Sequence, residues 1–246
     1  MKKINLLLAT IFVIIISCSR NTDADNSTTA GVKKPSKMTI TDSRGAVQVL
    51  TFEYEENKLK KVLISGLANV PEFFYQNNVL TEFKELATSS EKFIYDTSGK
   101  LTRVLSESPS AYFRADFTYD AGGNKINSAK LYRSPTSFWK EVKYDYDAKG
   151  NVIKVTNVTD NVVLNRIYDD KNNPFANVNI EFEDHNLLKN DWYSKPKNNC
   201  LSAAGVASTG QRGSSTFTYT YDSDNFPVLR VEKSGSTVKE TIKFEY

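Results

Sequence analysis

The chain has 246 residues, a formal net charge of +3 and 39% hydrophobic residues, so it is long enough to bury a sizeable core. Its nearly balanced charge provides no basic field for nucleic acid or an anionic membrane surface. The sequence has one histidine and two cysteines, which excludes a zinc site built on a histidine pair and allows at most one internal disulfide.

The N-terminal segment has the organisation of a secretory signal peptide. A positive region over 1–3 precedes an apolar run over 4–16, which is too short to span a bilayer. Residues 15–18 read Ile-Ile-Ser-Cys, which looks like a lipobox, the motif whose cysteine is lipidated on sulfur and becomes the new first residue. The sequence therefore predicts a signal peptide over 1–17 and a lipid anchor on Cys18. The alternative is an ordinary signal peptide that happens to end near a cysteine.

The segment 18–36 is polar and rich in small residues, so we expect the lipidated cysteine to be followed by a flexible tether. Ser19, in a position where Asp retains some lipoproteins in the inner membrane, favours the outer membrane. The periplasmic face and the cell surface both stay open. With Cys18 committed to lipid, Cys200 has no partner for a disulfide within the chain.

From residue 37 onward the chain repeats one short pattern. The unit reads aromatic, any residue, Tyr, Asp or another polar residue, two or three turn-forming residues, and then an alternating apolar run. The clean copies span 93–104 and 144–155; further copies span 52–59, 73–78, 117–124, 167–175 and 219–227, and 41–47 resembles a degenerate first copy. Period two on both sides of the turn predicts a β-hairpin, in which the Asp bonds the backbone and a glycine such as Gly99 accepts positive φ.

One hairpin is barely stable in water, so eight in series are expected to form one antiparallel meander of about sixteen strands. The predicted fold class is all-β, with the repeat domain over 37–246 curled into an open or nearly closed barrel-like sheet. A flatter, solenoid-like sheet is the alternative.

The segments 146–152 (Tyr-Asp-Ala-Lys-Gly-Asn-Val) and 95–101 (Tyr-Asp-Thr-Ser-Gly-Lys-Leu) resemble the YD repeat of RHS-type proteins. With the lipobox and the variant at 168–175, the chain is similar to a family of bacterial envelope lipoproteins. That family carries a domain of unknown function described as having a porin-like β fold. The resemblance covers 37–246 with a gap at 184–213; it implies a fold and brings no reaction or catalytic residue.

The sequence shows no constellation for catalysis. His185 is the only histidine, no Gly-x-Ser-x-Gly elbow accompanies it, and Cys200 is interpreted as a packed or incidental thiol. A segment at 145–150 resembles the start of a calcium loop but lacks its later oxygen ligands. We therefore expect no metal, no cofactor and no enzyme activity, although a glycosidase pair of carboxylates cannot be identified or dismissed by counting.

The repeat breaks at 184–213, which is predicted to be an irregular insertion and the best place for a site. The candidate ligand-binding residues are His185, Trp192 and Tyr193 in this insertion, and Trp139 near a hairpin tip, because aromatic faces stack on sugars. The alternative is an ordinary excursion with packed aromatic residues.

These observations favour a noncatalytic binding or structural protein of the cell envelope, attached to the membrane through lipid on Cys18. Its expected ligand is a glycan, a peptide or another envelope protein. One alternative is an outer-membrane β-barrel, since 242–246 ends in an alternating aromatic strand. A carbohydrate-active hydrolase is the other.

Overall fold

The computed structural model describes residues 33–246, except for 69, 87–88, 109–110, 179–195 and 208–209. The regular secondary structure of this described part consists of sixteen strands. They are β1 (Lys37–Asp42), β2 (Val47–Glu55), β3 (Lys58–Ile64), β4 (Glu72–Gln76), β5 (Val79–Leu86), β6 (Ser89–Tyr95), β7 (Leu101–Ser108), β8 (Ala111–Tyr119), β9 (Ile126–Tyr132), β10 (Phe138–Tyr146), β11 (Val152–Asn157), β12 (Val162–Tyr168), β13 (Cys200–Ala207), β14 (Gly210–Tyr221), β15 (Pro227–Ser234) and β16 (Thr237–Glu245).

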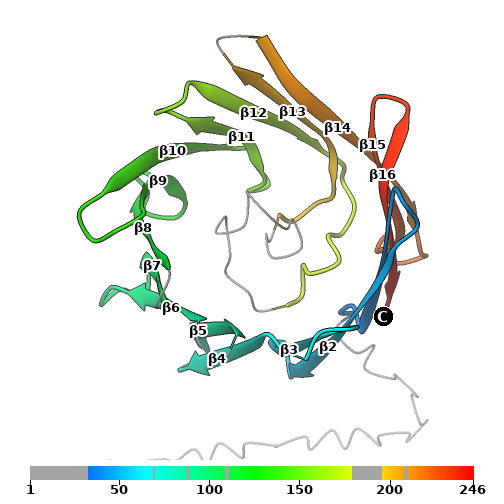
Figure 1. The fold of residues 1–246 in the computed structure, drawn as a ribbon, viewed down its shortest axis with the longest axis horizontal. Helices are drawn as coiled ribbons and strands as arrows, with labels where there is room; N and C mark the ends of the chain where they lie inside the picture. The colour runs from blue at the N-terminus through cyan, green and yellow to red at the C-terminus, as the bar shows by residue number, and fades with distance from the viewer. Residues whose placement is uncertain (1–32, 69, 87–88, 109–110, 179–195, 208–209) are drawn as a thin grey trace, which may run out of the picture. The chain divides into compact units, whose positions relative to one another are not determined.

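The sheet closes into a barrel (Figure 1). Each strand pairs antiparallel with its sequence neighbours, and β1 pairs with β16 from Lys37 opposite Glu245 to Asp42 opposite Glu240. This confirms the predicted all-β meander of about sixteen strands. It also decides between the open and closed forms in favour of closure, so the solenoid-like alternative is wrong.

Alternation along each strand decides which face is buried. On β2, Leu50 and Phe52 are 2% and 5% exposed, whereas Thr51 and Glu53, which alternate with them, face solvent. The apolar face is turned inward and forms the core of the barrel. Its other buried members include Met38, Leu59, Val62, Phe73, Phe93, Val104, Ala129, Val142, Ile242 and Phe244.

The Tyr-Asp turns are built by one hydrogen-bond pattern. In the turn at 95–101, Asp96 Oδ1 accepts the backbone N–H groups of Ser98 and Lys100 at 2.8 and 3.0 Å. The N–H of Gly99 donates to the Asp96 carbonyl at 3.0 Å, and Gly99 has a φ of 82°. The Asp-centred bonds recur at Asp120, Asp147 and Asp222. The predicted turn chemistry is therefore confirmed.

Seven hairpins carry a β-bulge at the same place. Tyr95 pairs with Leu101 while Ile94 pairs with Arg103, so Thr102 is the extra residue. The same shift occurs at the tyrosine of the other units, namely Tyr54, Tyr75, Tyr119, Tyr146, Tyr168 and Tyr221. A bulge increases local twist, so a repeated bulge supplies the repeated curvature that lets a wide sheet close.

Eight tyrosine hydroxyls link neighbouring units around one end of the barrel. Tyr95 donates to the carbonyl of Leu80 at 2.8 Å, and Leu80 is the residue that pairs with Tyr75 of the preceding unit. The other seven bonds run from Tyr54 to Pro35, Tyr75 to Leu59, Tyr119 to Leu101, Tyr146 to Ile126, Tyr168 to Val152, Tyr219 to Cys200 and Tyr246 to Pro227. We call these eight side chains the tyrosine ring.

The last unit of the ring is assembled from β16 and β1. Tyr246 follows β16, and the carbonyl of Pro35, just before β1, accepts the hydroxyl of Tyr54 at 2.8 Å. Pro35 thus takes the place that follows the turn in the other units. Lys33 forms an ion pair with Asp222 at 2.5 Å. The domain therefore begins by Lys33 rather than at residue 37 as predicted, because Pro35 completes this unit.

The turn at 41–47 is not a copy of the unit. Asp42 Oδ1 accepts the N–H groups of Arg44 and Ala46 at 2.8 and 2.9 Å, and Gly45 has a φ of 83°, as in the Tyr-Asp turns. This turn joins β1 to β2, however, and so lies at the end of the barrel opposite the tyrosine ring. The prediction of a degenerate first copy is wrong. The hydrogen bonds of such a turn are local, so the sequence of the turn does not show at which end of the barrel it lies.

The irregular insertion lies earlier in the chain than predicted. It occupies the turn after β12, where Asp169 Oδ1 accepts the N–H of Asn199 at 2.9 Å. Asn199 therefore takes the place that Lys100 has in the turn at 95–101. β13 and the start of β14 lie inside the predicted gap at 184–213 and pair with each other, with a register shift between Ala204 and Val206. Their serine, alanine and glycine residues have weak strand propensity, and pairing on both sides imposes the strand conformation.

Candidate functional site

The barrel interior contains a cavity of about 560 Å³, bounded by β1 to β3 and β12 to β16. This volume falls within the roughly 300–1,000 Å³ typical of small-molecule sites. The apolar part of its wall includes Met38, Leu50, Phe217, Ile242 and Phe244. Residues 169–178 of the insertion run inside the ring of strands (Figure 1), and Phe175 lines the cavity with its ring 5.4 Å from that of Phe52.

A charged cluster lies on the wall formed by β14, β15 and β16. Arg230 Nη2 lies 2.5 Å from Glu240 Oε1 and 3.8 Å from Glu232 Oε2. The Ser215 hydroxyl donates to Glu232 Oε1 at 2.7 Å. Glu232 and Glu240 are directly opposite in the β15–β16 register, where two like charges repel unless a cation is shared. We call Ser215, Arg230, Glu232 and Glu240 the interior charge cluster.

Arg230 keeps one donor that no described residue uses. Its side chain is 15% exposed, and its Nε is buried without a hydrogen-bond partner in the part of the chain that the structure describes. The guanidinium carbon lies 5.3 Å from the centroid of the Phe217 ring. Because buried donors are normally paired, this N–H is a candidate contact for an acceptor on a ligand.

Asn151 fastens the insertion to the rim of the barrel. Its side chain is fully buried, and Oδ1 accepts the backbone N–H groups of Lys197 and Asn198 at 2.9 and 3.1 Å. Its Nδ2 donates to Asp147 Oδ2 at 2.8 Å and to Asn198 Oδ1 at 3.0 Å. The amide therefore uses both its acceptor and its donors to hold residues 197–198 against the turn at 146–152.

The insertion also changes the tyrosine ring locally. Tyr221 occupies the ring position of its unit, but its hydroxyl donates to Asp169 Oδ2 at the neck of the insertion. Burial and this bond to a carboxylate raise the pKa of Tyr221 above its ordinary value. Tyr219 stacks on Tyr221 with ring centroids 5.8 Å apart and makes the ring's bond to the carbonyl of Cys200 instead.

Four of the five predicted site residues, namely Cys18, His185, Trp192 and Tyr193, lie outside the described residues. Trp139 lies in β10 and packs against the core, with the cationic groups of Arg133 and Lys140 at 4.0 and 4.3 Å from its ring. This surrounding favours a strand-end tryptophan over an open sugar platform. The Cys200 thiol donates to the carbonyl of Ser202 at 3.2 Å, in agreement with a packed cysteine.

Sequence reasoning missed the interior charge cluster. Glu240 has the same parity on β16 as the buried residues Ile242 and Phe244, so its side chain is turned inward. Arg230 lies opposite Ile242 in the register and is inward for the same reason. Charged residues at inward positions of an apolar face are the signal that could have identified them.

The described residues hold no group of three or more His, Cys, Asp and Glu side chains placed to bind a metal ion. A helix of the length and apolarity needed to cross a membrane is also not found among them.

Comparison with known proteins identifies a fold. No protein-family model and no curated protein matches the chain. A porin-like protein from Bacteroides uniformis is similar over 87% of this chain and 97% of its own, with a TM-score of 0.60 and 11% sequence identity. A porin-like protein from Bacteroides vulgatus is similar over 87% of this chain and 98% of its own, with a TM-score of 0.57 and 15% identity. The similarity is one of β-barrel architecture.

Proposed function

We propose that this chain is a lipid-anchored protein of the bacterial envelope whose barrel is surrounded by water rather than by lipid. In this proposal the barrel binds a small ligand in its interior and is not an enzyme. The observation that carries this proposal is the orientation of the barrel's two faces. The inner face carries the apolar core and a cavity whose wall joins apolar residues to the interior charge cluster, and the outer face carries charges of both signs. The barrel neighbours support an envelope location.

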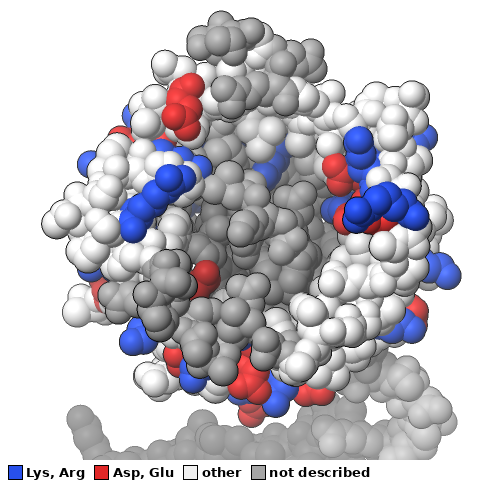
Figure 2. All heavy atoms as spheres, in the orientation of Figure 1, with Lys and Arg blue, Asp and Glu red and all other residues white. Residues whose placement is uncertain are grey.

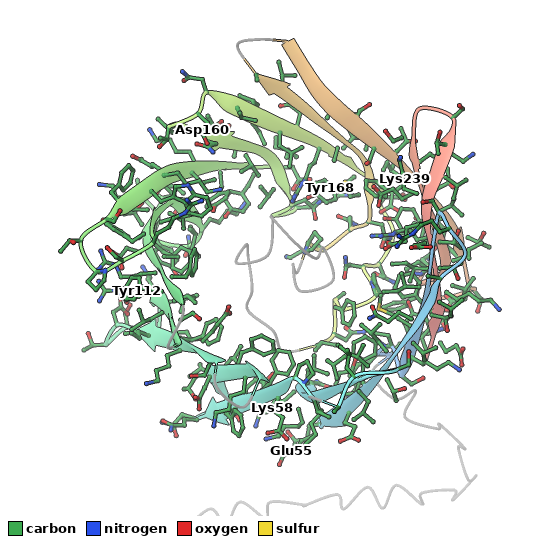
Figure 3. The ribbon with its side chains drawn as sticks, viewed as in Figure 1. Glu55, Lys58, Tyr112, Asp160, Tyr168 and Lys239 are labelled. Carbon is green, nitrogen blue, oxygen red and sulfur yellow. The ribbon has the colours of Figure 1, made fainter. Side chains whose placement is uncertain are left out.

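The outer face is polar along whole strands. On β16, Lys239, Thr241, Lys243 and Glu245 alternate with the inward residues. Charged residues pair across the outer surface, as Lys61 does with Glu72 at 2.8 Å. Figure 2 shows charged side chains around the rim of the barrel, and in Figure 3 Glu55 lies on the outer side whereas Tyr168 lies on the inner side.

This orientation argues against the outer-membrane alternative, although both structural neighbours are described as porin-like. A membrane barrel needs an outward apolar band, and each Lys or Arg facing lipid at mid-depth costs roughly 2–4 kcal/mol. Exposed apolar residues do occur here, but they are interspersed with charges; Ile94, for example, lies opposite Arg103. A barrel with this outer face is more stable in water than in hydrocarbon.

The proposed attachment is the lipid on Cys18, after removal of 1–17, at the outer membrane. The repeated tyrosine, aspartate turn and bulge also support our inference of kinship with the YD-repeat envelope lipoproteins. Anchoring is tested by expressing the chain and its Cys18→Ser variant in a bacterial host with metabolic labelling by a fatty acid. We expect fatty-acid label on the parent and none on the variant. A Cys18→Ser variant that still carries the label would contradict anchoring through Cys18.

The proposed ligand is a small amphiphile, such as a glycan fragment or peptide with apolar groups, because the cavity joins an apolar wall to the interior charge cluster. Its test uses 1-anilinonaphthalene-8-sulfonate, whose rings and sulfonate match the wall and the free donor of Arg230. Gln48 lines the cavity, and Val47 next to it on β2 is 59% exposed on the other face. Gln48→Trp should weaken binding about tenfold, and Val47→Trp should leave it unchanged. Equal effects would refute an interior site.

The hydrolase alternative rests on Glu232 and Glu240, which approach each other in the cavity. A glycosidase pair needs one carboxyl group as acid and the other as base or nucleophile. Here both carboxylates contact the guanidinium of Arg230, an arrangement of ion pairs rather than of a free acid beside a free base. This geometry supports a role in orienting a ligand.

A further inference from the structure

A second hollow, of about 610 Å³, lies at the end of the barrel that carries the tyrosine ring. It lies between the three turns at 95–101, 119–126 and 146–152, and the insertion reaches it through Lys197. It shares no lining residue with the interior cavity. The proposed interior ligand therefore does not account for it.

The charged residues that line this hollow are all lysines. Lys100, Lys125, Lys149 and Lys197 line it, and its lining includes no aspartate or glutamate. The side chains of the nearby turn aspartates accept hydrogen bonds from the backbone of their own turns. Asp120 Oδ1, for example, accepts two backbone N–H groups at 2.8 and 3.3 Å. The carboxylates of Asp96, Asp120 and Asp147 in the surrounding turns stay charged near neutral pH, because their pKa values are lowered. The four ammonium groups therefore exceed the nearby carboxylates by one.

Two of these lysines are held in place by the repeat itself. The ammonium groups of Lys100 and Lys125 lie 5.4 and 5.1 Å from the ring centroids of Tyr119 and Tyr146. Cation–π contact of this kind stabilises a cation without neutralising its charge. Gly123 makes room for the first of them, since a Cβ at that position would collide with the Lys100 ammonium.

The fourth lysine, Lys197, comes from the insertion, a distant part of the sequence. Its backbone N–H donates to Asn151 Oδ1 at 2.9 Å, and Asn151 is fully buried. The contact fixes the backbone of Lys197 while its side chain remains exposed at the hollow. Two independent devices, the repeat and the insertion, thus bring cations to one place.

We propose that this lysine hollow binds a small polyanion that carries at least two phosphate or carboxylate groups. Four ammonium groups in one hollow repel each other, and an anion with several charged oxygens relieves this repulsion. Lysine suits such a ligand because each ammonium is a flexible point charge that adapts to different anion geometries. Leu101, Ile126 and the ring of Tyr119 add an apolar floor for the body of the ligand.

The test is calorimetric titration of the purified full chain at low ionic strength with two probes, tripolyphosphate and trigalacturonate. Binding of either probe, weakened by added salt, supports the proposal, and the preferred probe identifies phosphate or carboxylate as the recognised group. Lack of binding by both probes overturns it.

Variants locate the binding. The double variant Lys100→Gln/Lys125→Gln should lower affinity at least about tenfold, and Lys197→Gln alone about threefold. Lys197→Gln is not expected to disturb the fold, because only the backbone of Lys197 takes part in the bond to Asn151. The matched control is Lys143→Gln/Lys239→Gln, which removes two exposed lysines from other parts of the barrel. Equal losses in the double variant and the control would show nonspecific attraction and overturn the site.

Discussion

At the scale of single residues, the tyrosine ring is the feature that local sequence does not reveal, because each hydroxyl bonds a carbonyl of the preceding unit. Tyr146 donates to the carbonyl of Ile126 at 2.6 Å. Tyr146→Phe should lower the free energy of unfolding by about 1–2 kcal/mol, since the bond is lost and a half-buried carbonyl is left unpaired. Urea unfolding measures this. The control is Tyr112→Phe, which removes a hydroxyl that bonds the Arg114 side chain rather than a carbonyl of the preceding unit. An equal loss there would contradict a special role for the ring.

The turn aspartates should make the barrel sensitive to acid. The Ser98 hydroxyl and backbone N–H groups hold the pKa of Asp96 below its ordinary 3.8, and the N–H groups of Asn124 and Lys125 do the same for Asp120. A pKa that is lower in the folded state stabilises the fold above the unfolded value, and this contribution is lost as pH falls through the folded pKa.

The urea midpoint should therefore be steady near neutral pH and fall as the pH drops below about 4. Asp96→Asn/Asp120→Asn should flatten that fall, because an amide oxygen still accepts the turn bonds and does not titrate. Asp145→Asn on the outer face is the control and should keep the parent's profile. An unchanged profile in the double variant would show that other groups cause the acid sensitivity.

At the scale of elements, the hairpins and their turns follow from sequence, because a Tyr-Asp turn uses only bonds between residues a few positions apart. The failures concern long-range pairing. Asp42 has the same turn chemistry as Asp96, yet only the pairing of β1 with β16 places its turn at the opposite end. Ser202 to Gly205 resemble a loop in composition, and become strand because β12 and β14 flank them. The position of Glu240 opposite Glu232 and beside Arg230 likewise needed the register between β15 and β16.

The insertion is an element whose attachment can be tested at one residue. Asn151→Ala leaves the backbone N–H groups of Lys197 and Asn198 without their acceptor in a buried place, which costs about 1–3 kcal/mol for each unsatisfied group. We expect lower stability and faster proteolysis within 170–198, with the strands intact by circular dichroism. Asn124 follows the glycine of an uninserted turn, as Asn151 does, and its N–H also donates to the turn aspartate. Its side chain is exposed, so Asn124→Ala is the control. Similar protease sensitivity in both variants would mean that Asn151 does not secure the insertion.

At the scale of the whole molecule, the eight units form a closed ring. The packing of the strands should therefore not depend on which turn of the ring contains the ends of the chain. β16 and β1 already pair like the two strands of a hairpin, although no turn joins them. The Ser36 N–H donates to the Glu245 carbonyl at 2.7 Å. Lys34 lies 4.9 Å from the ring of Tyr54, as Lys100 does over Tyr119, so it occupies the last position of a missing Tyr-Asp turn.

A circular permutant should therefore fold. Tyr246 is joined to Lys34 through Asp-Ala-Lys-Gly, and the chain is opened between the exposed residues Pro135 and Thr136. We expect a monomeric β protein at least as stable in urea as the parent, because the new turn completes the eighth unit with the bonds of the other Tyr-Asp turns. Replacing the linker's Asp by Ala should lower the urea midpoint, since the turn loses its acceptor. If both linkers give unfolded protein, the eight units are not equivalent and closure depends on the native order of strands.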